Sequence, residues 1–286
     1  MSIGLALSGG FVKGAAHIGV LQALEEENIK VDYISGTSSG SIVATLYAAG
    51  YSPNSILTLF NMYCKQIISF DKKVLMRLVT NFYNTISRDV SLANGENIEM
   101  VIRHTCGMKK IYNINQIKIP LAIPTVDINS GKIIYFTNRE VIKIDPDLKC
   151  FNNVNYEYSG NISSIVMASC SYPAIFSPKR YKGYNLVDGG VRLNTPVSIL
   201  KALGADKVIG VTFNNNKSNR ENCMLSVVLK SLDIMGDEIN KEEVKNSDFN
   251  ISFSIPSCNM FESNYINMYA NLGYRTTKSI INEIKS

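Results

Sequence analysis

Residues 3–50 have the sequence IGLALSGGFVKGAAHIGVLQALEEENIKVDYISGTSSGSIVATLYAAG, and this stretch decides the fold. The apolar run Ile3–Leu7 predicts a strand that ends in a glycine turn, and helical spacing predicts a helix from about Ala15 to Glu27. Val31–Ile34 predicts a second strand, and the apolar residues after Ser38 predict a second helix that stops at the last glycine of the stretch. Alternating strands and helices with tight glycine turns predict βαβ units and a parallel sheet.

The remainder of the chain continues this pattern. Residues from Pro53 to about Ile102 are expected to be helical and irregular, residues 152–161 are expected to form a polar surface loop, and a short helix should end near Ser169. An apolar stripe near the carboxyl terminus predicts a helix that packs on the core. We therefore expect an α/β fold, a three-layer α/β/α sandwich with a mostly parallel central sheet, in a single domain over residues 1–286 with a helical insert near residues 53–105. The further strands predicted are Leu121–Asp127, Lys132–Thr137, Asn185–Val187, Val208–Phe213 and Ile251–Ile255.

Composition and charge narrow the class of protein. Hydrophobic residues make up 45% of the 286 residues and charged residues 19%, which is typical of a globular chain with a sizeable core. No leader pattern and no apolar run near the roughly 20 residues of a membrane span is found, so a soluble protein is expected. The mild net charge of +5 indicates either solubility alone or weak attraction to an anionic surface such as lipid head groups, and the absence of a dense basic block argues against nucleic acid. The six scattered cysteines lack ligand spacing, so we expect reduced thiols in a cytoplasmic protein and no metal.

The segment Gly36-Thr37-Ser38-Ser39-Gly40 matches the pattern G-x-S-x-G between a predicted strand and a predicted helix. A nucleophilic serine has to project from such a sharp turn, where glycines leave room and the helix amino terminus supplies amides. The alternative is a plain glycine-rich turn with serine caps.

The turn from Ser8 to Gly14, with the sequence SGGFVKG, follows the first strand. Its exposed amides could hold a developing oxyanion. Its glycine spacing does not fit the dinucleotide fingerprint, and it lacks the ending of a P-loop, so nucleotide binding is only a minor alternative. A tight turn without a function remains the other interpretation.

The third segment is Asp188-Gly189-Gly190, which follows a short predicted strand. An aspartate there could point into a cleft while the glycines turn the backbone away, although capping of a turn is the commoner role of Asp-Gly. The chain has two histidines, His17 and His104, and neither follows Asp188. A triad in the order serine, acid, histidine is therefore not expected. If Ser38 is a nucleophile, a carboxylate is the remaining candidate for its base.

Together the three segments resemble the patatin-like phospholipase family, whose pattern is a glycine-rich oxyanion turn ending in a basic residue and glycine, then G-x-S-x-G, then D-G-G or D-G-A. The run from Ala168 to Pro178 and the run D-G-G-x-x-x-N-x-P from Asp188 to Pro196 are also similar to the family. The resemblance extends over about residues 3–213. It implies the three-layer fold and a Ser-Asp dyad without histidine.

The resemblance also implies a role for each matched residue. Ser38 would be the nucleophile and Asp188 its base, and the two would meet at the carboxyl ends of neighbouring strands. Gly9, Gly10 and Phe11 would supply the amides of the oxyanion hole. The family usually has a third glycine where this chain has Phe11, which would lose glycine-only dihedral angles. Lys13, in place of the more usual arginine, keeps the charge and loses the planar fork. The remaining motif residues are Gly14, Gly36, Gly40, Gly189 and Gly190.

The function implied is hydrolysis of acyl esters in lipids, with a lipid or acyl ester as the substrate, peripheral contact with a membrane, no cofactor and no nucleic acid. Two alternatives stay open, namely an acyltransferase and a non-catalytic lipid-binding regulatory protein. Residues 56–88 mix apolar and basic side chains, which is typical of a solvated helix face or of a lipid-docking lid. The oligomeric state is left open by the sequence.

Overall fold

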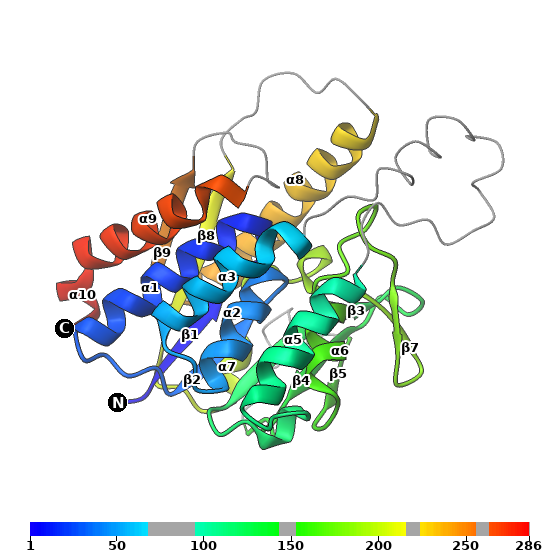
Figure 1. Ribbon diagram of the computed structural model, residues 1–286, viewed down its shortest axis with the longest axis horizontal. Coiled ribbons are helices and arrows are strands. Elements are labelled where there is room, and N and C mark those ends of the chain that lie inside the picture. Colours follow the sequence, from blue (N-terminus) through cyan, green and yellow to red (C-terminus); the bar gives the residue numbers. More distant parts are fainter. Residues whose placement is uncertain (68–94, 143–152, 216–223, 256–262, 286) are drawn as a thin grey trace.

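The computed structural model describes residues 1–67, 95–142, 153–215, 224–255 and 263–285. These residues form a mixed, mostly parallel sheet between two layers of helices (Figure 1). Its main path runs β5-β4-β3-β2-β1-β8-β9, and β7 and β6 branch from β3. The predicted α/β/α architecture is confirmed. The strands are β1 (Ile3–Leu7), β2 (Tyr33–Gly36), β3 (Leu121–Asp127), β4 (Ile133–Thr137), β5 (Val154–Glu157), β6 (Lys179–Tyr181), β7 (Tyr184–Asp188), β8 (Lys207–Asn215) and β9 (Phe249–Ile255).

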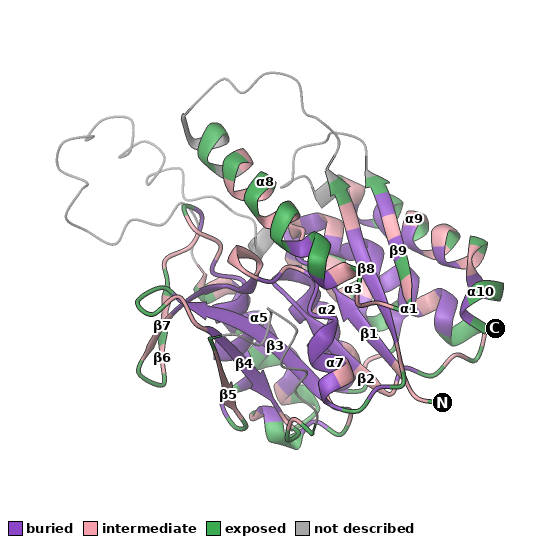
Figure 2. Ribbon diagram, turned by 180° about the vertical axis from the view of Figure 1, so that it is seen from behind, coloured by how far each residue is buried: buried purple, intermediate pink, exposed green. Residues whose placement is uncertain are grey.

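Alternation along the strands divides the core between the two faces of the sheet. On β1, Leu5 and Leu7 join the larger apolar cluster and Ala6 joins the smaller one. This is the period of two that a strand with both faces buried must have. The larger cluster includes residues of the helices at 15–26 and 39–48, and the smaller one includes residues of the helix at 198–202. Figure 2 shows the central strands as buried. The helices are α1 (Ala15–Glu26), α2 (Ser39–Ala48), α3 (Pro53–Ile67), α5 (Glu96–Met108), α6 (Ile162–Ser169), α7 (Ser198–Ala202), α8 (Met224–Val244), α9 (Ile266–Ser279) and α10 (Ile281–Lys285).

Most predicted elements are present, with three differences. β2 begins two residues later than expected, because its pairing with β1 starts at Tyr33 opposite Gly4. The surface loop predicted at 152–161 is wrong in part, since Val154–Glu157 pairs with β4 as a half-buried edge strand. The sequence prediction missed β6, α7 and α8. Of the predicted insert, α3 and α5 are described, while residues 68–94, which hold most of the expected lid, lie outside the described residues.

The described helices also bear on membrane insertion. Over the ranges that the structure covers, none combines the length and the apolarity that crossing a membrane requires.

Candidate active site

Ser38 lies at the sharp turn between β2 and α2, and its backbone is strained. Its φ and ψ are 53° and −125°, a combination that is rare for a non-glycine residue and costs about 1–3 kcal/mol. A Cβ on Gly36 would lie 2.3 Å from the carbonyl oxygen of Gly40, and a Cβ on Gly40 would lie 2.4 Å from that of Leu7. The glycines of the G-x-S-x-G pattern are therefore steric requirements of this turn.

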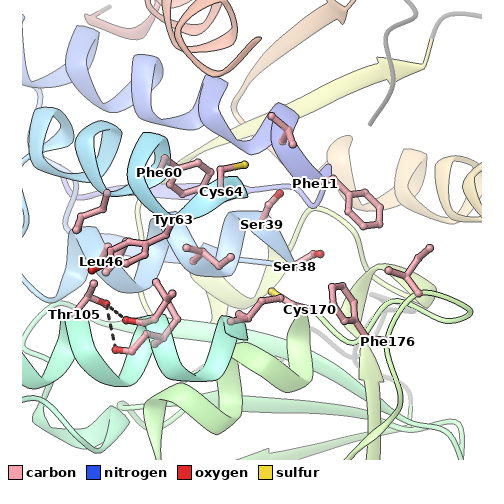
Figure 3. Close-up of a pocket in the computed structure, with 17 residues that line it drawn as sticks. Phe11, Ser38, Ser39, Leu46, Phe60, Tyr63, Cys64, Thr105, Cys170 and Phe176 are labelled. Atoms are coloured by element: carbon pink, nitrogen blue, oxygen red, sulfur yellow. Dashed lines mark hydrogen bonds between the residues drawn. The ribbon is translucent and has the colours of Figure 1, made fainter. Parts of the chain in front are cut away.

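The surroundings of Ser38 hold it in place. Figure 3 shows it at the start of α2, with Phe11 on one side and Cys170 on the other. Its N–H donates to Ser169 Oγ (3.1 Å), and the Ser169 hydroxyl donates onward to a carbonyl of β3 (2.9 Å). The Ser41 hydroxyl donates to the Ser38 carbonyl (2.6 Å). Ser38 is only 8% exposed, so its side chain meets a largely dry environment.

The pairing of β3 explains how Ser38 and Asp188 come together. β2 runs parallel to the first part of β3, with Ser35 opposite Ala122, whereas β7 runs antiparallel to the last part, with Asp188 opposite Thr125. Because β4 occupies the other edge of β3, β2 and β7 share one edge and their carboxyl ends face each other. The sequence had suggested that the two residues lie on neighbouring strands. In the structure β2 and β7 are not paired with each other; they run in opposite directions, and each pairs with β3.

Asp188 is a buried carboxyl group with an incomplete set of hydrogen bonds. It is 1% exposed, and its Oδ1 accepts the Gly190 N–H (2.7 Å). Burial raises the pKa of Asp188 to about 7, against the opposing effects of the Ser38 hydroxyl and the Gly190 N–H. The Ser38 hydroxyl is thus close enough to affect the carboxyl group, yet Oδ2 has no partner with hydrogen-bond geometry among the described residues.

The glycine turn presents its amides unequally. The Gly9 N–H donates to Asn194, at 2.9 Å from Oδ1 and 3.4 Å from the carbonyl oxygen, so it is already engaged. The Gly10 N–H donates to no acceptor within the described part of the chain. A Cβ on Gly10 would lie 2.7 Å from the ring of Phe213. Of the predicted oxyanion amides, the geometry therefore favours Gly10 over Gly9.

Phe11 keeps the backbone that a glycine would adopt. Its φ is 53°, so the expected loss of glycine-like dihedral angles does not occur, although the side chain makes this conformation costly. Its ring packs edge-on against Tyr172, with centroids 5.3 Å apart. Phe11 also forms part of the wall of both pockets that meet at Ser38.

Two pockets of different chemistry flank Ser38. The apolar pocket runs between α2, α3 and α5, and Ile42, Leu46, Phe60 and Ile102 are among its lining residues (Figure 3). The polar pocket lies on the side of Asp188 and is also lined by Lys13, Tyr172, Asn194, Asp233 and Asp237. The arrangement can hold a long apolar group on one side of the hydroxyl and a polar group on the other.

The two histidines and Cys170 do not supply a base to Ser38. His17 is fully buried, its Nε2 lies 2.7 Å from the Ser8 carbonyl oxygen, and burial lowers its pKa to about 4, so it supports the turn as a neutral ring. His104 is exposed on α5. Burial raises the pKa of the Cys170 thiol far above its usual range, which keeps it neutral beside Ser38. In the described ranges no group of three or more potential ligands could hold a metal ion.

Sequence reasoning missed several residues of the site. Asn194 was noticed only as part of a motif, and its bond to the glycine turn joins positions 185 residues apart. Asp233 and Asp237 belong to α8, which no pattern had indicated. Tyr172 lies in a stretch that the resemblance covered, without a role assigned to it.

Comparison with known proteins identifies a family that this chain matches. The model of the family described as patatin-like phospholipase matches residues 5–201. "Lysophospholipase NTE1" of Meyerozyma guilliermondii is 29% identical over 210 residues, which are 73% of this chain and 12% of that protein. "Uncharacterized protein R571" of Acanthamoeba polyphaga mimivirus is 32% identical over 224 residues, which are 75% of this chain and 66% of that protein. The chain thus spans about an eighth of the fungal protein's length.

A solved structure has a similar fold. The ExoU-SpcU complex from the type III secretion system of Pseudomonas aeruginosa contains a chain that matches all of this chain over 52% of its own length. The TM-score is 0.50 and the sequence identity is 15%. At that identity the similarity concerns the fold alone.

Proposed function

The chain belongs to the patatin-like phospholipase family, and from that premise we propose that it is a lipid acyl hydrolase of the phospholipase A, lysophospholipase or esterase type. The observation that carries the proposal is the meeting of a strained serine and a buried aspartate between an apolar and a polar pocket. An acyl ester has the same division, with its chain on one side of the carbonyl carbon and its alcohol on the other.

In the proposed reaction Ser38 Oγ attacks the ester carbonyl carbon while Asp188 accepts the hydroxyl proton. The Gly10 N–H and the first amides of α2 stabilise the negative charge on the carbonyl oxygen. Collapse of the tetrahedral intermediate breaks the bond to the alcohol, which takes the proton from Asp188 and leaves an acyl-enzyme. Water then attacks the acyl group, Asp188 takes a proton from it, and that proton returns to Ser38 as the fatty acid leaves.

The environment of Asp188 supports its role as base. An ordinary carboxylate, with a pKa of 3.8, is too weak a base to deprotonate serine efficiently. A pKa of about 7 brings the group to the point where a large fraction is ionised at neutral pH and the carboxylate still holds a proton well.

Labelling with a fluorophosphonate probe tests the nucleophile, because this reagent reacts with activated serines. The wild-type protein should be labelled, and Ser38→Ala should be neither labelled nor able to hydrolyse p-nitrophenyl butyrate. Ser39→Ala is the matched control, since it removes the neighbouring hydroxyl, which is buried without a hydrogen-bond partner in the described region, and it should keep the label. A wild-type protein that resists the probe would favour the non-catalytic alternative. Transfer of a labelled acyl group to an added alcohol in preference to water would favour the acyltransferase.

We also propose that the protein contacts lipid surfaces through α8. Several apolar residues of this helix are exposed, and Figure 2 colours much of α8 as exposed or intermediate, while other residues of the same helix line the polar pocket. A lipid surface is the partner that matches this position, because the substrate would then lie beside the site at which its ester is cut. The exposed residues are Val227 (50%), Val228 (44%), Ile234 (60%), Met235 (60%) and Ile239 (47%).

A further inference from the structure

The polar pocket beside Ser38 has two walls that come from distant parts of the chain. One wall is the catalytic edge of the sheet, with Asp188 and the glycine turn, and the other is α8, with Asp233, Gly236 and Asp237. The family match ends at residue 201, so α8 lies beyond it. The pocket therefore combines a wall typical of the family with one that this chain supplies outside the matched region.

The register of α8 against the site is fixed by buried hydrogen bonds. Asn240 accepts the Thr195 N–H at Oδ1 (2.8 Å), and Glu243 accepts the N–H and the hydroxyl of Ser198 (2.6 and 2.9 Å). Asp233 and Asp237 precede Asn240 by seven and three residues, so they lie on the same side of the helix, two turns and one turn closer to its amino terminus. The bonds that hold α8 to Thr195 and Ser198 thus orient its two aspartates toward the pocket.

The lining of the pocket combines carboxylates, aromatic rings and one cation. The Tyr172 hydroxyl donates to Asp233 Oδ1 (3.0 Å), which orients that carboxylate and brings the ring into the same wall. Lys13 is the cation among the described lining residues, against Asp188, Asp233 and Asp237. Asp188 belongs to the same lining, and its Oδ2 is buried without a hydrogen-bond partner among the described residues. A head group in this pocket would therefore lie beside the Asp188 carboxyl group at the Ser38 end.

We propose that this pocket binds the alcohol half of the ester and that Asp233 and Asp237 select head groups that carry an amine or a quaternary ammonium group. Carboxylates attract the cationic end and aromatic faces favour it, whereas a head group with only negative charge meets the two aspartates and is repelled. Lys13 suits the phosphate of a zwitterionic head group. The proposal rests on the proposed hydrolase function and names its substrate class.

The test compares two substrates with the same acyl chain. Palmitoyl lysophosphatidylcholine is zwitterionic and palmitoyl lysophosphatidylglycerol is anionic, and both are presented at equal mole fraction in micelles of a neutral detergent. The wild-type protein should hydrolyse the choline lipid with a kcat/KM at least about tenfold higher, which corresponds to about 1.4 kcal/mol. Asp233→Asn and Asp237→Asn should each move the ratio toward one, mainly through the KM of the choline lipid. Glu238→Gln makes the same change of charge at an exposed position of α8 outside the pocket and should leave the ratio unchanged.

Three results would overturn the proposal. Equal kcat/KM values for the two lipids in the wild-type protein would remove the selectivity itself. A ratio that survives both aspartate substitutions would place the selectivity elsewhere, and a ratio that requires added Ca²⁺ and disappears with a chelator would place a metal ion in the pocket. In each case hydrolysis of p-nitrophenyl butyrate that depends on Ser38 would leave the proposed function standing. Loss of that soluble-ester activity in the wild-type protein would instead refute the hydrolase, and the head-group proposal with it.

Discussion

Replacing Asp188 with asparagine should stabilise the protein while it abolishes turnover. The carboxyl group is buried, and its pKa is raised by burial from 3.8 to about 7. Between these two values the unfolded chain has lost a proton that the folded chain retains, so the free energy of unfolding falls as the pH rises from about 4 to 7. At 1.36 kcal/mol per pH unit, the destabilisation at pH 8 amounts to about 4 kcal/mol.

Asparagine has the same shape and cannot ionise, and its Oδ1 can still accept the Gly190 N–H. The difference in the free energy of unfolding between Asp188→Asn and wild type should therefore grow by about 3 kcal/mol from pH 5 to pH 8. Unfolding in guanidinium chloride at the two pH values, followed by circular dichroism, measures this difference. Two proteins whose stability changes in parallel with pH would refute the assignment of a raised pKa to Asp188.

Asp127 provides a control of opposite sign. It ends β3 as Asp188 ends β7, and although burial opposes the change, hydrogen bonds from Ser130 and the Asn185 N–H lower its pKa. Its contribution to stability is therefore present above the ordinary pKa of an aspartate and is lost as the pH falls further. Asp127→Asn should be less stable than wild type at pH 8, and the difference should shrink toward pH 3.

Three further predictions concern catalysis and lipid contact. The kcat/KM for a soluble ester should rise with pH and level off above about 7, because Asp188 must lose its proton to act as base; a flat profile between pH 5 and 8 would contradict this. Gly10→Ala should lower kcat by about 100-fold with a small change in KM, because the new Cβ meets the Phe213 ring and shifts the amide; steady-state kinetics measure it, and an unchanged kcat would exclude the Gly10 N–H from the oxyanion hole. Ile234→Ser with Met235→Ser should weaken sedimentation with phosphatidylcholine vesicles by at least tenfold, since each side chain is worth about 1.5–3 kcal/mol when buried, and should spare soluble-ester turnover; unaltered sedimentation would reject docking through α8.

The parts of the fold that sequence predicted are those with local causes. Gly36 and Gly40 follow from the steric demands of one turn, and the strands β1 and β3 follow from short, mainly apolar runs whose two faces are both buried. The hydrogen bond from the Gly9 N–H to Asn194 could not be predicted, because Asn194 lies in the segment between β7 and α7, far from Gly9 in the sequence. The Ser38–Asp188 pair was anticipated from the resemblance, while the antiparallel approach of β7 that brings it about left no local signal.

The helix α8 was not predicted because its polar residues face inward and its apolar residues face outward, which is the reverse of the usual arrangement. Its inward side carries Asn240 and Glu243, both buried, and its outward side carries exposed residues such as Ile234 and Met235. An amphipathic helix is normally recognised by an apolar stripe that faces the core. In α8 that stripe faces outward, and buried hydrogen bonds replace apolar packing in holding much of the inward side.

The exposed apolar side of α8, the strained backbone of Ser38 and the Asp188 oxygen that lacks a hydrogen-bond partner among the described residues are departures of the same general type. Each lowers the stability of the folded chain in water, and each is of a different physical kind: backbone geometry, burial of a carboxyl group, and exposure of apolar surface. Departures that lower stability tend to gather where function requires them. All three border the polar pocket or lie on an element that lines it. Because the causes are physically independent, their common location supports a single functional centre more strongly than any one of them does, and it predicts that relieving one of them should stabilise the protein at the expense of its activity.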